Sequence, residues 1–187
     1  MSEAGASPEL LVHWDEFIRL DEDDLRELID GRLVEVEVPD FEHERIVAEL
    51  VRHLGNWNAD HDAGVVLPTG YKVRISDIRG VMPDVQLLSH ETASKAGHLG
   101  MAEGRPDLAV EVISPSSRRY DRVTKLAWYA SIGVPEYWLV DRDARIIERL
   151  ALTEHGYVIA QTAAEGTFEP ASFPGLAIPL AALFPAG

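Results

Sequence analysis

Two acidic side chains have the residue type and the setting that metal-assisted chemistry requires. Asp84 follows a proline at the start of a predicted strand, and Glu111 lies inside the apolar run Leu108–Ile113. An ionised carboxylate among apolar residues is unfavourable unless it is hydrogen-bonded, is held to a cation or opens into a cleft. Two carboxylates from adjacent strands can hold a divalent cation, which polarises a phosphoryl oxygen and lowers the pKa of bound water. The pair is therefore a candidate site for hydrolysis of a phosphate ester.

The same residues also have structural explanations, which the sequence leaves open. Asp84 could cap the turn after Pro83, and Glu111 could pair with an arginine. A pair of carboxylates is weak evidence for a metal site, since such pairs are common by chance. Lys125 lies four residues after Asp121, a spacing that gives an exposed helix salt bridge worth ~0.2–0.5 kcal/mol. Replacing Lys125 is then expected to change folding very little. Its functional role would be that of a cation that orients water or stabilises negative charge in the transition state.

A basic turn follows the strand that carries Glu111. Ser114 begins the run Ser-Pro-Ser-Ser, which ends the strand and offers a helix N-cap. Arg118, Arg119 and Arg122 come next, and with Ser114 they could contact phosphates of a nucleic acid. A solvated helix face is the commoner explanation of such a charge run. Of the seven histidines only His43 is singled out, because it begins a long amphipathic helix.

Composition limits the class of protein. With 46% hydrophobic and 26% charged residues, the chain is typical of a globular domain, which we expect over residues 10–187 behind a flexible tail at 1–9. The absence of cysteine excludes thiolate metal sites and fits a cytoplasmic location. No apolar run is long enough to cross a membrane. The net charge of −15 argues against a protein that coats nucleic acid non-specifically.

The order of the predicted elements indicates an α/β domain with a mixed central sheet. Helices are expected at residues 10–20, 41–57 and 118–131, the last with its core face formed by Val123, Leu126, Ala127 and Ala130. Hairpins are expected around the Asp30-Gly31 turn and between residues 136–140 and 145–150. Further strands are predicted at 65–67, 71–75, 81–88 and 157–161, a polar loop at 89–105 and an irregular apolar cover at 173–184.

Several segments, spread from about Trp14 to Leu150, carry a family resemblance. They are residues 27–31 (ELIDG), His43 with its helix, Pro83-Asp84-Val85, residues 107–116, Tyr120-Asp121 with Lys125, and residues 133–141. Together they resemble the Uma-type putative restriction endonucleases, a family of the PD-(D/E)XK nuclease superfamily. The resemblance implies a restriction-endonuclease-like fold, in which a mixed central β-sheet is flanked by helices.

The resemblance also implies an activity and roles for individual residues. It implies an endonuclease that uses Mg²⁺ or Mn²⁺ to hydrolyse phosphodiester bonds, with DNA as its partner. By position, Asp84 and Glu111 are catalytic metal ligands. Ile113 stands where the superfamily has a lysine, so the resemblance implies that Lys125 supplies the catalytic cation from the next helix. His43 and Glu44 are expected as accessory groups.

A second class of function stays open. The chain could be a catalytically inactive nuclease-like fold that acts as a nucleic-acid- or protein-binding module. Ile113 and the net charge of −15 favour that function, whereas Asp84, Glu111 and Lys125 favour the nuclease. By analogy with the superfamily, a homodimer is also expected, with the hairpin region of Tyr137 and Trp138 as an exposed surface that could pair.

Overall fold

The central strand of the molecule is β8 (Leu108–Ile113), which is buried along its whole length. The computed structural model describes residues 10–21, 23–35 and 39–185. Strand β8 lies in a six-stranded sheet of order β11-β10-β9-β8-β6-β3, which comprises β3 (Gly64–Pro68), β6 (Val85–Ser89), β9 (Glu136–Asp141), β10 (Ile146–Thr153) and β11 (Gly156–Ala163). Because β8 is parallel to β9 and antiparallel to β6, the predicted mixed sheet is confirmed.

A second sheet has the order β2-β1-β5-β4-β7. Its strands are β1 (Glu27–Ile29), β2 (Arg32–Val34), β4 (Lys72–Ser76), β5 (Arg79–Val81) and β7 (Gly100–Met101). The hairpin predicted at Asp30-Gly31 is present, and both turn residues have positive φ, as a two-residue hairpin turn requires. The single strand predicted at 81–88 is wrong. Pro83 lacks the N–H that a strand ladder needs, and the chain leaves β5 there and enters β6 in the other sheet.

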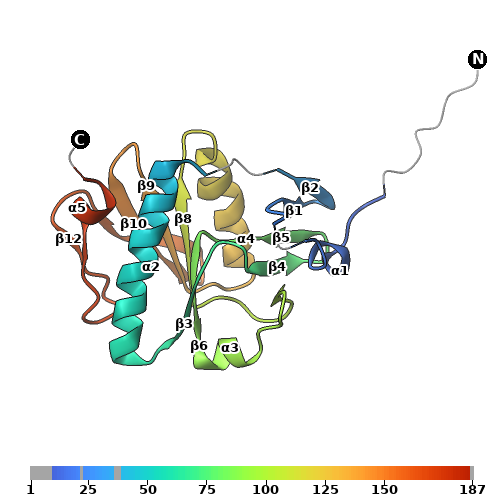
Figure 1. Cartoon of the computed structure of the whole chain (residues 1–187), viewed down its shortest axis with the longest axis horizontal. Coiled ribbons are helices and arrows are strands. Elements are labelled where there is room, and N and C mark those ends of the chain that lie inside the picture. Colours follow the sequence, from blue (N-terminus) through green and yellow to red (C-terminus); the bar gives the residue numbers. More distant parts are fainter. Residues whose placement is uncertain (1–9, 22, 36–38, 186–187) are drawn as a thin grey trace, which may run out of the picture.

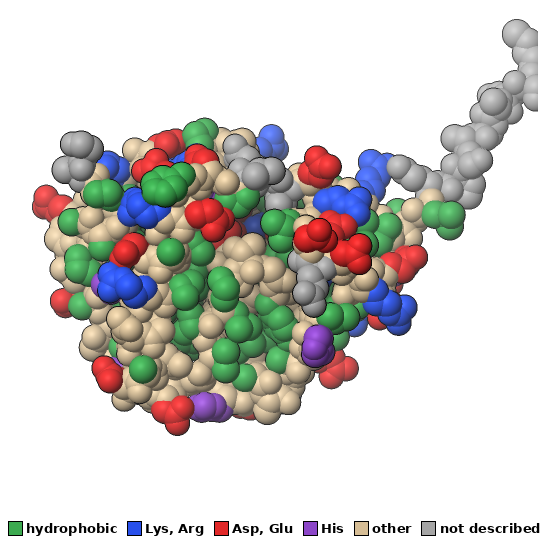
Figure 2. Space-filling view, in the orientation of Figure 1, with side chains coloured by type: hydrophobic (Ala, Val, Ile, Leu, Met, Phe, Trp, Pro, Cys, Tyr) green, Lys and Arg blue, Asp and Glu red, His purple; other side chains and the backbone are tan. Residues whose placement is uncertain are grey.

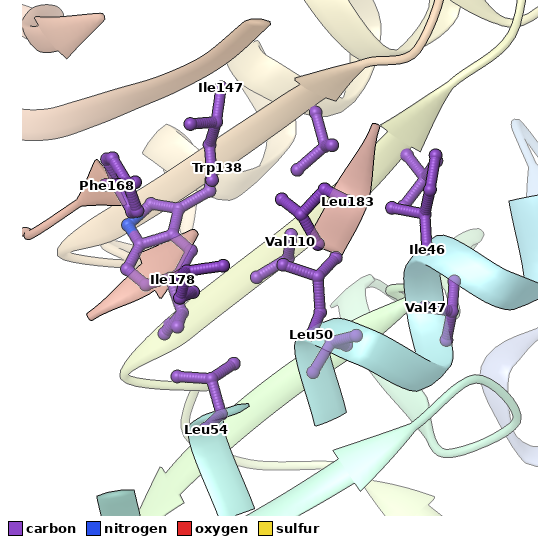
Figure 3. Close-up of a cluster of buried hydrophobic side chains, with 14 of the residues drawn as sticks. Ile46, Val47, Leu50, Leu54, Val110, Trp138, Ile147, Phe168, Ile178 and Leu183 are labelled. Carbon is purple, nitrogen blue, oxygen red and sulfur yellow. The ribbon is translucent and has the colours of Figure 1, made fainter. Parts of the chain in front are cut away.

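One face of the central sheet packs against α2 (Phe41–His61), which is longer than predicted. The side chain of Asp40 caps this helix by accepting a hydrogen bond from the His43 amide. Figure 3 shows Leu50 and Val110 within the buried cluster that joins the helix to β8. The expected C-terminal cover completes this core with three short elements: β12 (Thr167–Phe168), β13 (Ile178–Pro179) and α5 (Leu180–Leu183).

The opposite face is covered by the helix that follows β8 (Figure 1). It contains a π-helical segment, η1 (Tyr120–Lys125), that continues into α4 (Leu126–Ser131). A π-turn closes its hydrogen bonds one residue further along the chain and so shifts the face that follows. The predicted core face is therefore wrong in part: Leu126 packs against this core, but Val123 is 58% exposed and Ala127 is exposed. The buried residues of the helix are Asp121, Lys125, Trp128 and Tyr129.

The remaining elements complete the fold. The helix predicted at 10–20 is the single turn α1 (Trp14–Phe17), and the polar loop contains the short helix α3 (His90–Ser94). The expectation of an exposed surface at Tyr137 and Trp138 is wrong, because both side chains are fully buried within β9. Among the described residues, no helix has the length and apolar character needed to cross a membrane.

Candidate active site

A cavity of about 390 Å³ lies where β1, β8, η1 and the beginning of α2 meet. Its lining includes Asp84, Glu111 and Lys125, the three residues predicted to be catalytic. Two further acids, Glu27 of β1 and Asp121 of η1, line it as well. The fold thus brings the three predicted side chains to one cavity from three separate parts of the sequence.

The ammonium group of Lys125 lies among three carboxylates at the floor of the cavity. Its Nζ is 3.0 Å from Glu111 Oε1, 3.1 Å from Glu27 Oε1 and 3.7 Å from Asp121 Oδ1. The lysine side chain is only 6% exposed, so the expectation of an exposed Asp121–Lys125 pair is wrong. The physical reason is the π-turn, which directs both side chains towards β8 rather than into solvent.

Burial and charge together set the protonation of this cluster. Burial alone would lower the pKa of Lys125, but Glu111, Glu27 and Asp121 outweigh it and raise that pKa well above the usual range. Burial raises the pKa of Glu111 well above its usual range, against the opposing charge of Lys125, and the nearby acids Asp84, Asp121 and Glu27 add to the increase. Lys125 therefore stays cationic, and three acidic side chains surround one positive charge.

Hydrogen bonds fix the orientation of the two buried glutamates. The Tyr129 hydroxyl donates to Glu111 Oε1 at 2.7 Å, and burial raises the pKa of Tyr129 so that this donor stays protonated. The Met82 amide donates to Glu27 Oε1 at 3.1 Å. Glu27 Oε2 is buried and has no hydrogen-bond partner among the described residues. That oxygen is a free acceptor in an already negative site.

Asp84 is held at the cavity by β8 and by α2. Its Oδ2 accepts a hydrogen bond from the Val112 amide at 2.7 Å and lies 3.2 Å from His43 Nε2. The carboxylate thus bonds across to the neighbouring strand instead of capping the turn after Pro83. Burial lowers the pKa of His43, but the hydrogen bond and charge of Asp84 outweigh it, so the pKa of the imidazole is raised.

Two groups predicted from the sequence do not enter the cavity. Glu44, expected as an accessory acid, is 61% exposed and does not line it. Of the predicted phosphate contacts, Ser114 lines the cavity but the three arginines do not. Arg118 and Arg122 lie 3.2 and 3.4 Å from Asp141, and Arg122 also lies 2.5 Å from Glu148. Arg119 is exposed and makes no ion pair with a described residue.

Several acids of the lining offer carboxylate oxygens, which suit hard cations such as Mg²⁺ and Mn²⁺, and His43 adds a nitrogen donor at the edge of the site. No group of three or more histidines and acids among the described residues has an arrangement that would hold a metal ion. Lys125 occupies the space among Glu27, Glu111 and Asp121. Of the predicted ligands, Asp84 and Glu111 both line the cavity, and the Asp84 charge helps to raise the pKa of Glu111.

Glu27 is the member of this cluster that reasoning from the residues missed. It was noted only within the ELIDG segment, whose turn signal predicts a hairpin. The signal that could have found it is the one that identified Glu111, an acid within a short apolar strand. Its partner Lys125 lies almost a hundred positions further along the chain, so local spacing does not predict the contact.

Comparisons with known proteins bear on the fold and on the family. Residues 14–181 match the sequence family Uma2, described as "putative restriction endonuclease". Among solved structures, the chain is similar to a crystal structure of a putative nuclease belonging to DUF820 from Anabaena variabilis ATCC 29413. The two are 18% identical with a TM-score of 0.73 over 92% of this chain and 97% of that chain. No curated protein matches the chain. The predicted restriction-endonuclease-like fold is confirmed.

Proposed function

The chain belongs to the Uma2 family of putative restriction endonucleases, and on this premise we propose that it is a metal-dependent endonuclease that hydrolyses phosphodiester bonds in DNA. The observation that carries the proposal is the position of Lys125. Its ammonium lies 3.0 Å from Glu111, in the cavity that Asp84 also lines. Ile113, which stands at the superfamily's lysine position, is buried in the apolar core. Lys125, from the helix that follows β8, thus supplies a cation beside Glu111.

Asp84 and Glu111 would hold Mg²⁺ or Mn²⁺. Three features support a cation here: both residues offer carboxylate oxygens, the acids of the described lining outnumber its cations, and Glu27 Oε2 lacks a partner among the described residues. When bound, such an ion polarises a phosphoryl oxygen and lowers the pKa of a bound water. Zn²⁺ is less well suited, because it prefers sites rich in nitrogen and sulfur ligands.

The protein's own residues supply positioning and charge. Attack on a phosphodiester adds negative charge at phosphorus, and Lys125, which stays cationic, can stabilise that charge or orient the attacking water. Glu27 and Asp121 hold the lysine in place. Tyr129 orients Glu111, and His43 with the Val112 amide orients Asp84. Each group that would act on the substrate is therefore fixed by a neighbour.

The second function is that of a nuclease-like binding module without catalysis. The observation that favours it is the ion pair itself, because Lys125 neutralises part of the Glu111 charge that a metal ion would use. The apolar Ile113 and the net charge of −15 point the same way. Such a module would bind a nucleic acid or a protein and leave the phosphodiester bond intact.

A cleavage assay separates the two functions. Wild type would be incubated with Mg²⁺ or Mn²⁺ and with single-stranded, duplex and branched DNA and RNA, beside Asp84→Ala. The matched control is Asp60→Ala, which removes an exposed acid of α2 far from the cavity lining. A nuclease loses its cleavage in Asp84→Ala and keeps it in Asp60→Ala. Equal residual cleavage in all three proteins, or none in any, contradicts the proposal.

The metal site has its own test. Calorimetry with Mn²⁺ should show binding to wild type that is lost or strongly weakened in Glu111→Ala, because one of the two oxygen donors is removed. The Asp60→Ala protein serves again as the control for a change of charge. Equal Mn²⁺ affinities of wild type and Glu111→Ala would exclude Glu111 as a ligand.

A further inference from the structure

The cavity has an acidic floor and an apolar wall. The wall is formed by the hairpin side of the cavity, where Leu25, Ile29 and Val34 line it. Leu25 is 40% exposed and Val34 is 38% exposed, although both belong to the cavity lining. Tyr120 contributes an aromatic ring to the same lining. These apolar side chains are partly open to solvent and lie beside an ionic floor. The cavity therefore suits a ligand with a charged end, which meets the floor, and a flat, weakly polar end, which packs on the wall.

The floor is too deep for the phosphates of an intact duplex. The side chains of Glu111 and Lys125 are 3% and 6% exposed, so a phosphodiester must enter the cavity to reach them. A volume of about 390 Å³ lies at the small end of ordinary ligand sites and is of the size of one nucleotide. Duplex DNA is stiff over roughly 150 base pairs and carries its phosphates on a wide cylinder. An unpaired strand bends freely and can enter the cavity.

The charges around the cavity also disfavour a duplex. Binding to duplex DNA relies on Lys and Arg side chains that neutralise successive phosphates. Arg142, the one arginine among the described residues of the lining, is paired with Asp40. Arg118 and Arg122 are paired with acids outside the cavity. On the side of the molecule that Figure 2 shows, Lys and Arg side chains are interspersed with Asp and Glu rather than gathered along one track.

From the depth, the wall and the charges, we infer that this site takes an unpaired nucleotide of single-stranded DNA and excludes the intact duplex. The inference rests on the proposed function and names its substrate class. The phosphate reaches the floor beside Lys125, and the base packs on Leu25, Ile29, Val34 and Tyr120. Packing of a base against a side chain is sequence-tolerant, because every base has an apolar face.

The test compares one labelled oligonucleotide as a single strand and as a blunt duplex. Initial rates would be measured with Mn²⁺ for wild type and for Leu25→Ser/Val34→Ser, which makes the wall polar without adding charge next to Glu27. The matched control is Val158→Ser/Ile159→Ser, which replaces two exposed apolar side chains of β11, outside the cavity lining, that have the sizes of Val34 and Leu25. Circular dichroism and thermal unfolding would check the fold of each protein.

The expected result is that wild type cleaves the single strand at least roughly tenfold faster than the duplex. The wall variant should raise KM for the single strand by roughly tenfold with little change in kcat, because base packing contributes to binding. The β11 variant should match wild type. Duplex cleavage at an equal or higher rate, or an unchanged KM in a folded wall variant, overturns the inference while leaving the nuclease proposal intact.

If no DNA is cleaved, the nuclease proposal fails and the inference is tested by binding alone. Fluorescence anisotropy of the same two labelled DNAs with the full chain then decides it. Tighter binding of the single strand, weakened in the wall variant, supports an unpaired nucleotide in the cavity. Equal or tighter binding of the duplex overturns it.

Discussion

The two faces of β8 carry six residues of one strand and differ in what they bury. Leu108, Val110 and Val112 face α2 within an entirely apolar cluster. Ala109, Glu111 and Ile113 face the helix that follows, and there Glu111 contacts Lys125 and Tyr129. Replacing a buried ion cluster by apolar residues is often neutral or stabilising. The face towards α2, the apolar face, is stabilised by apolar burial alone. The other, polar face adds to its own apolar cluster an ion cluster, which is retained at a cost that a function would explain.

The largest expected effect is that of Lys125→Met, which removes the cation of the ion cluster on the polar face. It leaves Glu27, Glu111 and Asp121 without their shared cation, so we expect the free energy of unfolding to fall by about 3–5 kcal/mol. Any cleavage should fall by roughly a hundredfold or more through loss of an electrostatic stabiliser. Urea denaturation and initial rates measure the two effects.

A second variant keeps the test informative if Lys125→Met unfolds. The double variant Lys125→Met/Glu111→Gln removes one uncompensated charge and should recover part of the stability without recovering cleavage. Cleavage within a few-fold of wild type in a folded Lys125→Met protein would contradict the role of this lysine.

The matched change on the apolar face is Leu50→Ala. Leu50 is fully buried in α2 against the β8 cluster, and removal of its side chain should lower the free energy of unfolding by about 3 kcal/mol. Below the unfolding transition, the specific activity of the folded protein should stay at the wild-type value, because no side chain of the cavity is changed. A loss of activity as large as that of Lys125→Met would show that the two faces are not separate in function.

Local patterns were sufficient to predict the apolar face. The two-residue period identifies β8, and the helical stripe containing Leu50 and Leu54 identifies α2. The turn at Asp30-Gly31 gives the first hairpin. Each of these signals depends on a few consecutive residues, so the structure that it predicts does not depend on distant contacts. The order of the elements was enough for the mixed sheet that the structure contains.

The polar face could be predicted only in part. The sequence singled out Asp84, Glu111 and Lys125, but it assigned Lys125 to a solvated helix surface. An ideal helical period of 3.6 residues does not reveal a π-turn, which rotated the helix and buried Lys125 while exposing Val123. The contact between Glu27 and Lys125 depends on how β1 packs against the helix that follows β8, and short-range spacing carries no information on that packing.

His43 connects the two faces of β8. It belongs to α2, which covers the apolar face, and yet its imidazole contacts Asp84 in the cavity. Its pKa is raised in the folded protein, so the interaction contributes fully below the unfolded pKa of about 6.5. That contribution is lost as the pH rises through the folded pKa. In metal-free buffer, wild type should lose a small part of its free energy of unfolding between pH 6 and pH 8. Urea titrations should show less of this loss in His43→Gln.

The exposed His155 is the control for the pH experiment. It is 87% exposed on the β10–β11 hairpin, so His155→Gln should keep the wild-type pH dependence. If His43→Gln and wild type lose stability in parallel between the two pH values, the raised pKa of His43 is not linked to folding.

The smallest expected effect concerns Arg119, at the exposed beginning of the helix on the polar side. Arg122 must break ion pairs with Asp141 and Glu148 before it can bind a phosphate, whereas Arg119 makes no ion pair with a described residue. Each phosphate neutralised by a free cation adds about 0.7 to the slope of log K against log salt for single strands. We therefore expect Arg119→Ala to reduce that slope by about 0.7 and Arg122→Ala to reduce it less.

Fluorescence anisotropy of a labelled single strand at several salt concentrations, in an Asp84→Ala background that prevents cleavage, measures both slopes. Equal slopes in Arg119→Ala and the parent protein would place this arginine on a solvated surface without a role in binding.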